Sequence, residues 1–190
     1  RAIMARQRSE MAENTTFQSL NSTVDMPVIP VLARMEYTGI QLDTLYLAQF
    51  SEQIEDTISD LEQEIYGHAD HEFNIASPAQ LADILFVKLG LPTQGIKRGK
   101  TGYSTAASEL DKLRPAHPII DLISQYREVT KLKNTYVDTL PKLVDGHGRV
   151  HTTFNLTIAQ TGRLSSTDPN LQNIPVRTEL GKHIRAAFVA

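Results

Sequence analysis

The residues best suited to chemistry lie in one polar segment near the C-terminal end, residues 161–177, which reads TGRLSSTDPNLQNIPVR. Pro169 and Pro175 exclude a continuous helix, and the segment has little apolar periodicity. Its amides and arginines can meet the acceptors that all base pairs present in the minor groove, and an arginine fork can bridge phosphate oxygens. The segment is therefore suited to a polar, anionic ligand held independently of its sequence. A hydrogen-bonded structural loop is the alternative interpretation.

A second candidate is the loop at residues 95–102, GIKRGKTG, which resembles part of a nucleotide-binding phosphate loop. That motif requires a glycine five positions before its glycine–lysine pair, and it comes directly after a strand. Position 94 is glutamine and the preceding pattern is helical, so we reject this interpretation. Lys97, Arg98 and Lys100 are nevertheless suited to contacts with a phosphate backbone, although an ordinary solvated loop would have the same composition.

Other residue patterns do not indicate a site. His68 and His71 could contribute to a metal site, but they come after a predicted helix end with no third cluster of ligands, which favours a solvated turn. No paired carboxylates and no Ser/His/Asp arrangement stand out in the sequence. The chain contains no cysteine, which excludes disulfides and thiolate metal sites and is consistent with a reducing compartment.

Charge is distributed unevenly along the 190 residues. The net charge is −3, yet residues 36–72 carry ten acidic side chains and no Lys or Arg, whereas residues 73–190 carry fifteen basic and nine acidic side chains. Nucleic-acid binding requires only such local positive potential, although an ordinary solvated surface would also produce it. No apolar run approaches the roughly 20 residues of a membrane span, and no signal peptide is evident, so we expect a cytoplasmic protein.

Hydrophobic periodicity predicts a mainly helical chain large enough to bury a sizeable core. Residues 1–24 show little pattern beyond a possible short helix. Asp43 is a predicted N-cap, and Ser77 with Gln80 forms a predicted capping box. The predicted helices cover residues 25–37, 43–67, 77–89, a short segment from 105, and about 119–140; the predicted strands begin at 149 and at 183.

Five blocks of sequence together resemble family A DNA polymerases of the bacterial polymerase I type. They are MPVIPVLARMEYTGIQLD, YREVTKLKNTYVDTLP, GRVHTTFN, the polar segment 161–177, and GKHIRAAFVA. The blocks occur in the family's order and near its spacing, and they extend from residue 26 to residue 190. Agreement of several linked blocks makes a chance resemblance implausible.

The resemblance implies a set of DNA contacts. Arg163 would reach the minor groove at the primer terminus, and Arg177 would lie near the primer end or the incoming nucleotide phosphates. The amides of Asn170, Gln172 and Asn173 would line the nascent duplex. Residues on the thumb would hold the DNA backbone: Arg127, Lys131, Lys133, Asn134 and Thr135, together with Lys97, Arg98 and Lys100 at the thumb tip.

The resemblance also implies the domain organisation. The expected fold class is α+β, mainly α, with an antiparallel helical thumb followed by the first strands of an antiparallel palm sheet. Residues 1–25 would be the tail of a preceding exonuclease-like domain or a linker, residues 26–145 the thumb with a basic tip loop near 95–104, and residues 146–190 the start of the palm. We expect the chain to end before the first catalytic carboxylate of the palm.

No catalytic or metal-binding residue is therefore expected in this chain. In the family, two palm carboxylates hold two Mg²⁺ ions, which activate the primer 3′ hydroxyl and stabilise the leaving pyrophosphate. Deoxynucleoside triphosphates would bind through palm and finger residues that are not represented here. Asp168 precedes Pro169 within the polar segment, where capping a turn is a better interpretation than ligation of a metal.

The leading hypothesis is a fragment of a template-directed DNA polymerase, active in replication and repair, that grips primer–template duplex but is inactive alone. We expect a monomer with no membrane partner, located in the bacterial cytoplasm at the nucleoid. Two alternatives remain. The chain could be a free-standing, non-catalytic DNA-binding remnant or a truncated reading frame, or it could be a helical interaction module without salt-dependent binding to duplex.

Overall fold

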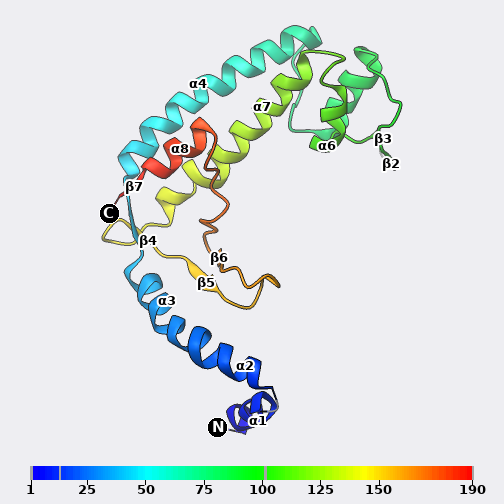
Figure 1. Cartoon of the computed structure of the whole chain (residues 1–190). Coiled ribbons are helices and arrows are strands. Elements are labelled where there is room, and N and C mark those ends of the chain that lie inside the picture. Colours follow the sequence, from blue (N-terminus) through cyan, green and yellow to red (C-terminus); the bar gives the residue numbers. More distant parts are fainter. Residues whose placement is uncertain (1, 13, 101, 190) are drawn as a thin grey trace.

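The computed structural model describes residues 2–12, 14–100 and 102–189 (Figure 1). Helices account for most of it, and the strands are few and short. The predicted fold class, α+β with mainly α structure, is therefore confirmed. The α-helices are α1 (Ala2–Ala12), α2 (Thr15–Leu20), α3 (Met26–Thr38), α4 (Thr44–Ala69), α5 (Pro78–Ala82), α6 (Ala107–Leu110), α7 (Ile119–Leu132) and α8 (Glu179–Ala186). The π-helical turns η1 (Asn21–Asp25), η2 (Asp83–Lys88) and η4 (Lys133–Val137) continue α2, α5 and α7, and two 3₁₀ turns are η3 (Asp111–Leu113) and η5 (Leu140–Lys142).

The N-terminal helices form an arm that extends away from the rest of the molecule (Figure 1). The sequence predicts little structure before residue 25, but α1, α2 and η1 make this region helical. Asn14 begins α2 by accepting hydrogen bonds from the backbone N–H groups of Thr16 and Phe17 at 3.1 and 3.2 Å. The predicted helix at 25–37 is α3, and Gly39 with a φ of 62° caps its C-terminal end.

The long helices α4 and α7 pack against each other along their lengths. The side chain of Asp43 caps α4, as predicted, by accepting a hydrogen bond from Tyr46 N at 2.8 Å. The predicted end at Gly67 is wrong by two residues, because Gly67 stays helical and Asp70 adopts the left-handed conformation with a φ of 54°. The apolar stripe of α4 is buried, and the partner helix that the stripe requires is α7.

Two hydrophobic clusters share this helical pair. One lies around the N-terminal half of α4, the C-terminal half of α7, α8 and the small sheet, and it includes Leu47, Ile54 and Ile184. The other surrounds the opposite ends of α4 and α7 with α5, η2 and α6, and it includes Ile65, Leu85 and Ile120. The pair therefore connects two packed ends of the molecule.

The predicted helix from Ser77 is present as α5 and η2. Ser77 accepts a hydrogen bond from Gln80 N at 3.5 Å, but the reciprocal half of the capping box is absent, because the side chain of Gln80 accepts from Asn74 N at 2.7 Å instead. The chain then turns at Gly90, whose φ is 61°. The predicted basic loop is folded as a hairpin of β2 (Arg98–Gly99) and β3 (Gly102–Tyr103).

The remaining strands form two small antiparallel sheets. β1 (Ile40–Leu42) lies between β4 (Arg149–Val150) and β7 (Phe188–Val189), and β5 (Thr153–Asn155) pairs with β6 (Ser165–Thr167). The strand predicted from residue 149 is present but divided, because β4 ends at Val150 and β5 begins at Thr153 in the other sheet. Val150 and Thr152 are buried, and Phe154 is half-buried. Together these strands lie near the junction of the arm and the helical pair (Figure 1).

The predicted strand at 183–190 is wrong over its first half. Residues up to Ala186 belong to α8, and only Phe188 and Val189 form a strand. Thr178 caps α8 by accepting a hydrogen bond from Gly181 N at 3.1 Å. Leu180, Ile184 and Ala187 pack inward at helical spacing, and this burial by α7 and the sheet outweighs the apolar run's strand propensity.

Gly181 permits the closest backbone approach in this region. A Cβ atom there would lie 2.2 Å from the carbonyl oxygen of Pro175, whereas a Cβ at Gly67 in α4 would meet nothing within 4 Å. We expect Gly181→Ala to lower the free energy of unfolding by about 1–3 kcal/mol through overpacking. The matched variant Gly67→Ala should raise it by about 0.5–1 kcal/mol through helix propensity. Urea denaturation measures both, and a neutral Gly181→Ala would contradict the close contact.

Candidate nucleic-acid interface

The hairpin β2–β3 carries three exposed cations at one end of the helical pair (Figure 1). Its register places Arg98 opposite Tyr103, and the guanidinium of Arg98 lies 5.4 Å from the centroid of the Tyr103 ring. Lys97 and Lys100 are exposed on the same hairpin. Short, exposed cationic loops of this kind can contact phosphates without reading bases.

A buried carboxylate fixes the base of this hairpin. Glu109 is only 2% exposed, and its Oε2 atom accepts hydrogen bonds from Lys112 Nζ at 2.7 Å and from Lys97 N at 3.1 Å. These two hydrogen bonds lower the pKa of Glu109, and the one from Lys112 has the larger effect. Lys112 also donates to the carbonyl of Gly95 at 2.8 Å. The backbone N–H of Lys97 thus helps to hold the hairpin, while the residue itself is exposed.

Arg127 connects α7 to the segment after the hairpin. Its guanidinium donates to the carbonyl oxygen of Thr105 and, at 3.3 Å, to the hydroxyl of the same residue. Burial lowers the pKa of Arg127. The side chain also lines a cavity of about 480 Å³ between α5, the hairpin and α7, beside Pro78, Tyr103 and Ala106. Arg127 is therefore partly committed to holding the hairpin region in place.

The other residues predicted on this helix divide into two groups. Lys131, Asn134 and Thr135 are exposed. Lys133 is 9% exposed, and its Nζ atom lies 3.0 Å from Glu55 Oε1 and 2.8 Å from Asp138 Oδ2. The sequence contained a signal for this, because Lys133 is four residues from both Val129 and Val137, which are buried.

The polar segment 161–177 combines the two interpretations that the sequence left open. Its centre is a structural loop: buried Ser166 accepts a hydrogen bond from Leu171 N at 3.1 Å, and Thr152 donates to the carbonyl oxygens of Thr167 and Pro169 at 3.0 and 2.8 Å. Strand β6 within the segment pairs with β5, so the segment is fixed to the sheet. Hydrogen bonds thus hold its backbone, and Ile174 and Leu171 anchor the segment to the hydrophobic cluster around α8 and the sheet.

The residues predicted to contact DNA lie on the outside of this loop. Arg163, Asn170, Gln172, Asn173 and Arg177 are all exposed. Asn170 also has an internal role, because its Oδ1 accepts hydrogen bonds from the backbone N–H groups of Gln172 and Asn173 at 3.1 and 3.3 Å. Its amide NH₂ group is the part that can serve a ligand.

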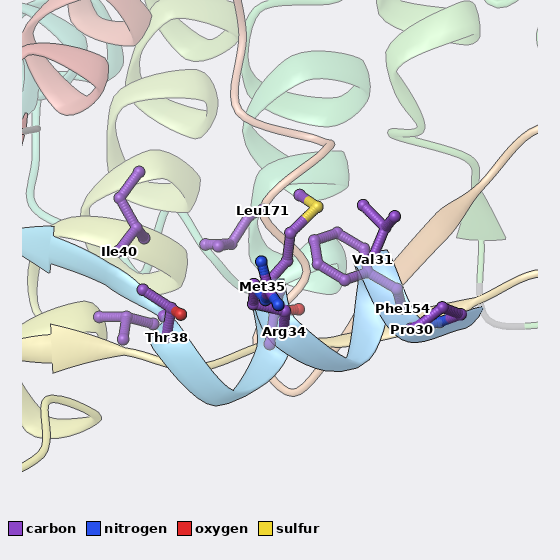
Figure 2. Close-up of a pocket in the computed structure, with 11 residues that line it drawn as sticks. Pro30, Val31, Arg34, Met35, Thr38, Ile40, Phe154 and Leu171 are labelled. Atoms are coloured by element: carbon purple, nitrogen blue, oxygen red, sulfur yellow. The ribbon is translucent and has the colours of Figure 1, made fainter. Parts of the chain in front are cut away.

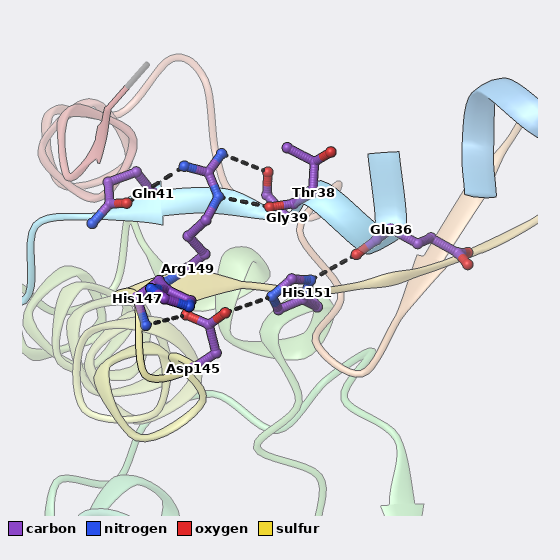
Figure 3. Close-up of polar contacts among 8 residues, drawn as sticks. All are labelled: Glu36, Thr38, Gly39, Gln41, Asp145, His147, Arg149 and His151. Carbon is purple, nitrogen blue, oxygen red and sulfur yellow. Dashed lines mark hydrogen bonds and ion pairs between the residues drawn. The ribbon is translucent and has the colours of Figure 1, made fainter. Parts of the chain in front are cut away.

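A polar network at the C-terminal end of α3 was missed by sequence reasoning (Figure 3). Arg149 donates to the carbonyl oxygens of Thr38 and Gly39 at 2.6 and 3.0 Å. His151 donates through Nδ1 to the carbonyl oxygen of Glu36 at 2.7 Å and through Nε2 to Asp145 at 3.2 Å. Cationic side chains thereby satisfy the carbonyl groups that a helix end leaves without partners.

Titration of this network is governed by its hydrogen bonds. Backbone N–H groups of Arg149 and His147, and then the ring of His151, lower the pKa of Asp145 from 3.8 to about 2. The carbonyl of Glu36, and then the carboxylate of Asp145, raise the pKa of His151. The protonated imidazole is the form that donates two hydrogen bonds, so it stabilises the junction between α3 and β4.

We expect the stability of the protein to depend on pH through both groups. The pKa of Asp145 is lowered on folding, so its contribution is present above about pH 3.8 and is lost as the pH falls toward 2. The pKa of His151 is raised, so its contribution is complete below 6.5 and is lost as the pH rises through the folded value.

Melting temperatures between pH 2 and pH 9 measure these contributions. Asp145→Asn should remove part of the acid transition, and His151→Gln should lower the melting temperature more at pH 5.5 than at pH 9. His147→Gln changes an exposed histidine in the same turn and serves as the control. A loss from His151→Gln that is equal at both pH values would contradict a raised pKa.

An apolar groove of about 630 Å³ lies between α3 and the strands β4 and β5 (Figure 2). Val31, Met35, Ile40, Phe154 and Leu171 contribute most of its apolar lining. Val31 and Met35 are about half exposed, at 54% and 48%. No sequence motif indicated this groove, because its walls come from segments more than 100 residues apart.

Neither a metal centre nor a membrane helix is found in the described ranges. Within residues 2–12, 14–100 and 102–189, no group of three or more His, Cys, Asp or Glu side chains could hold a metal ion. The same ranges contain no helix both long enough and apolar enough to cross a bilayer.

Comparison with known proteins decides the family. The family model described as DNA polymerase family A matches residues 44–190, which is most of the chain. This chain belongs to DNA polymerase family A. The match includes α4, the hairpin, α7 and the polar segment 161–177, whereas the arm formed by α1, α2 and α3 lies before it.

Bacterial DNA polymerase I proteins are close relatives over nearly the whole chain. The thermostable DNA polymerase I of Thermus thermophilus is 57% identical over 173 residues, covering 90% of this chain and 21% of the relative. DNA polymerase I of Synechocystis is 43% identical over 188 residues, covering 98% of this chain and 19% of the relative. The chain thus spans about a fifth of the length of these curated polymerases.

A solved structure has the same fold. The chain is similar to the POL domain of Pol1 from M. smegmatis, in complex with DNA primer-template and dNTP, with a TM-score of 0.82 and 44% sequence identity. The likeness covers 95% of this chain and 32% of that domain. The resemblance to family A predicted from the sequence blocks is confirmed.

Proposed function

We propose that the parent protein is a DNA-directed DNA polymerase of the polymerase I type, and that these 190 residues are a fragment that grips primer–template duplex. The observation that carries the proposal is the match of residues 44–190 to DNA polymerase family A. The similar POL domain, solved with a primer-template and dNTP, supports DNA and nucleotides as the partners of the parent. The parent protein would act in DNA replication and repair.

In this proposal, residues 26–145 are the thumb, with its tip at the hairpin β2–β3, and residues 146–190 are the start of the palm. Residues 1–25 would end a preceding domain or link to it. The helical pair α4–α7 supports this division, since it is elongated, with the cationic hairpin at one end and the small sheet at the other. An elongated element of this shape can track a duplex backbone.

The exposed polar residues supply two kinds of DNA contact. Lys97, Arg98, Lys100 and Lys131 offer charges to phosphates, which displace counterions and bind without sequence preference. Arg163 and the amides of Gln172 and Asn173 are exposed on the polar segment and offer donors to minor-groove acceptors. Arg177, Asn134 and Thr135 complete the exposed set, while Arg127 and Asn170 act partly through the backbone they hold.

The chemical step belongs to other parts of the parent polymerase. We propose that carboxylates outside these 190 residues would hold two Mg²⁺ ions, which would supply charge stabilisation for nucleotidyl transfer. The fragment itself binds duplex, orients it and incorporates no nucleotide. The parent would act as a monomer in the bacterial cytoplasm, at the nucleoid.

Duplex binding by the 190-residue chain tests the grip directly. We expect log Kobs for a primer–template to fall linearly with log salt concentration, with a slope of about −0.9 for each neutralised phosphate. Binding should be insensitive to sequence. Arg114→Ala is the control, because Arg114 is an exposed arginine that pairs with Asp111 and Asp121 and is not among the proposed contacts. Salt-independent binding, or none, would contradict the grip.

Arg163→Ala in the longer parent polymerase separates orientation from affinity. One groove contact is lost among many phosphate contacts, so primer extension should fall more than duplex affinity does. Steady-state extension rates and equilibrium binding, measured on the same primer–template, give the two ratios. Equal losses in extension rate and in duplex affinity would contradict a position of Arg163 at the primer terminus.

A further inference from the structure

Lys133, which the family resemblance predicts to hold the DNA backbone, faces the protein. The ammonium of Lys133 lies 3.0 and 2.8 Å from the two carboxylate oxygens of Asp138 and 3.0 Å from Glu55 Oε1. An ammonium group has three donors, and these three oxygens are sufficient to occupy them. Only 11% of the side chain is exposed. A phosphate would have to displace these carboxylates in order to bind Lys133.

The same residue closes the π-helical turn η4. The backbone carbonyl of Lys133 accepts a hydrogen bond from the N–H of Asp138 at 3.0 Å, while their side chains form the ion pair. Asp138 in turn accepts a hydrogen bond from the hydroxyl of Ser51 on α4 at 3.0 Å. Two contacts to α4, through Ser51 and Glu55, therefore fix η4 at both of its ends.

Charge balance supports a permanent ion pair. Burial by itself would lower the pKa of Lys133, but hydrogen bonds with Asp138 and Glu55 outweigh burial and raise it. Burial would raise the pKa of Asp138, and its hydrogen bonds with Lys133 and Ser51 lower it instead. Removing the carboxylates would leave the mostly buried ammonium of Lys133 without partners, which is the costly case, whereas Asp138 is 31% and Glu55 is 66% exposed.

We propose that Lys133 is a positioning residue that fastens η4 to α4, and not a phosphate contact. The proposal rests on the DNA grip described above and refines it. With Lys133, Tyr136 and Val137 turned inward, Asn134 and Thr135 stand exposed on the outer side of η4. The π-helical turn adds a residue between buried positions, and the ion pair fixes the direction in which these two side chains face.

Lys131 provides the matched comparison, since it is a lysine two residues away that is exposed. We expect Lys131→Met to make the salt slope of duplex binding less steep by about 0.9, as for one lost phosphate contact. Lys133→Met should leave the slope unchanged and lower the melting temperature. Asp138→Asn should lower the melting temperature without a further loss in the double variant with Lys133→Met, because both changes break the same pair.

A binding cycle distinguishes positioning from general loss of stability. Asn134→Ala should weaken duplex binding by about two- to tenfold in the otherwise unchanged chain, as for one hydrogen bond. In the Lys133→Met background, the same substitution should have a smaller effect, because Asn134 is no longer held outward. If Lys133→Met does not fold, Glu55→Gln removes the more exposed half of the network and takes its place in the cycle.

Two results would overturn the inference: a salt slope reduced by Lys133→Met as much as by Lys131→Met, or effects of Lys133→Met and Asn134→Ala that are independent. Failure of the proposed function looks different. In that case the unchanged chain would show no salt-dependent duplex binding, whereas the melting temperatures of the Lys133 and Asp138 variants would still report the ion pair.

Discussion

Packing of α4 against α7 is the constraint on which the rest of the structure depends. The two helices contribute to both hydrophobic clusters, so neither end of the molecule has a core without them. At one end the pair carries the cationic hairpin through α5, η2 and α6, and at the other it carries α8 and the small sheet. Loss of this contact would separate the two surfaces that the proposed grip needs to present together.

Several cationic side chains stabilise places where the chain changes direction. Arg149 and His151 bind the carbonyl groups at the end of α3, Arg127 binds the backbone at Thr105, and Lys133 fastens η4 to α4. Each stabilises a junction between elements, where backbone acceptors or carboxylates would otherwise lack partners. Net basic charge in residues 73–190 therefore overstates the charge that is free to meet a nucleic acid.

The polar segment 161–177 is held by hydrogen bonds together with one buried apolar side chain, Ile174. Ser166 and Thr167 accept hydrogen bonds that hold it, and the close approach of Gly181 to Pro175 sets α8 directly against its backbone. Backbone contacts that hold a loop in one conformation before a ligand arrives reduce the entropy lost on binding. That property suits a surface that must recognise a duplex repeatedly, whatever its sequence.

The sequence by itself determined the family, the class of the fold and most of the helices. The caps Asp43 and Ser77 and the apolar stripe of α4 are local signals, and local signals are readable because they depend on neighbours a few residues away. The start of a strand at Arg149 was readable for the same reason. The blocks of family resemblance carried the assignment to family A polymerases.

Only the tertiary structure decided the partners of particular side chains. The helix α8, predicted as a strand, forms because Leu180, Ile184 and Ala187 are buried against distant elements. Lys133 pairs with Glu55 because α4 packs beside η4, and the walls of the groove meet from segments far apart in sequence. Sequence patterns record the periodicity of one element, whereas burial and ion pairing depend on which elements fold together.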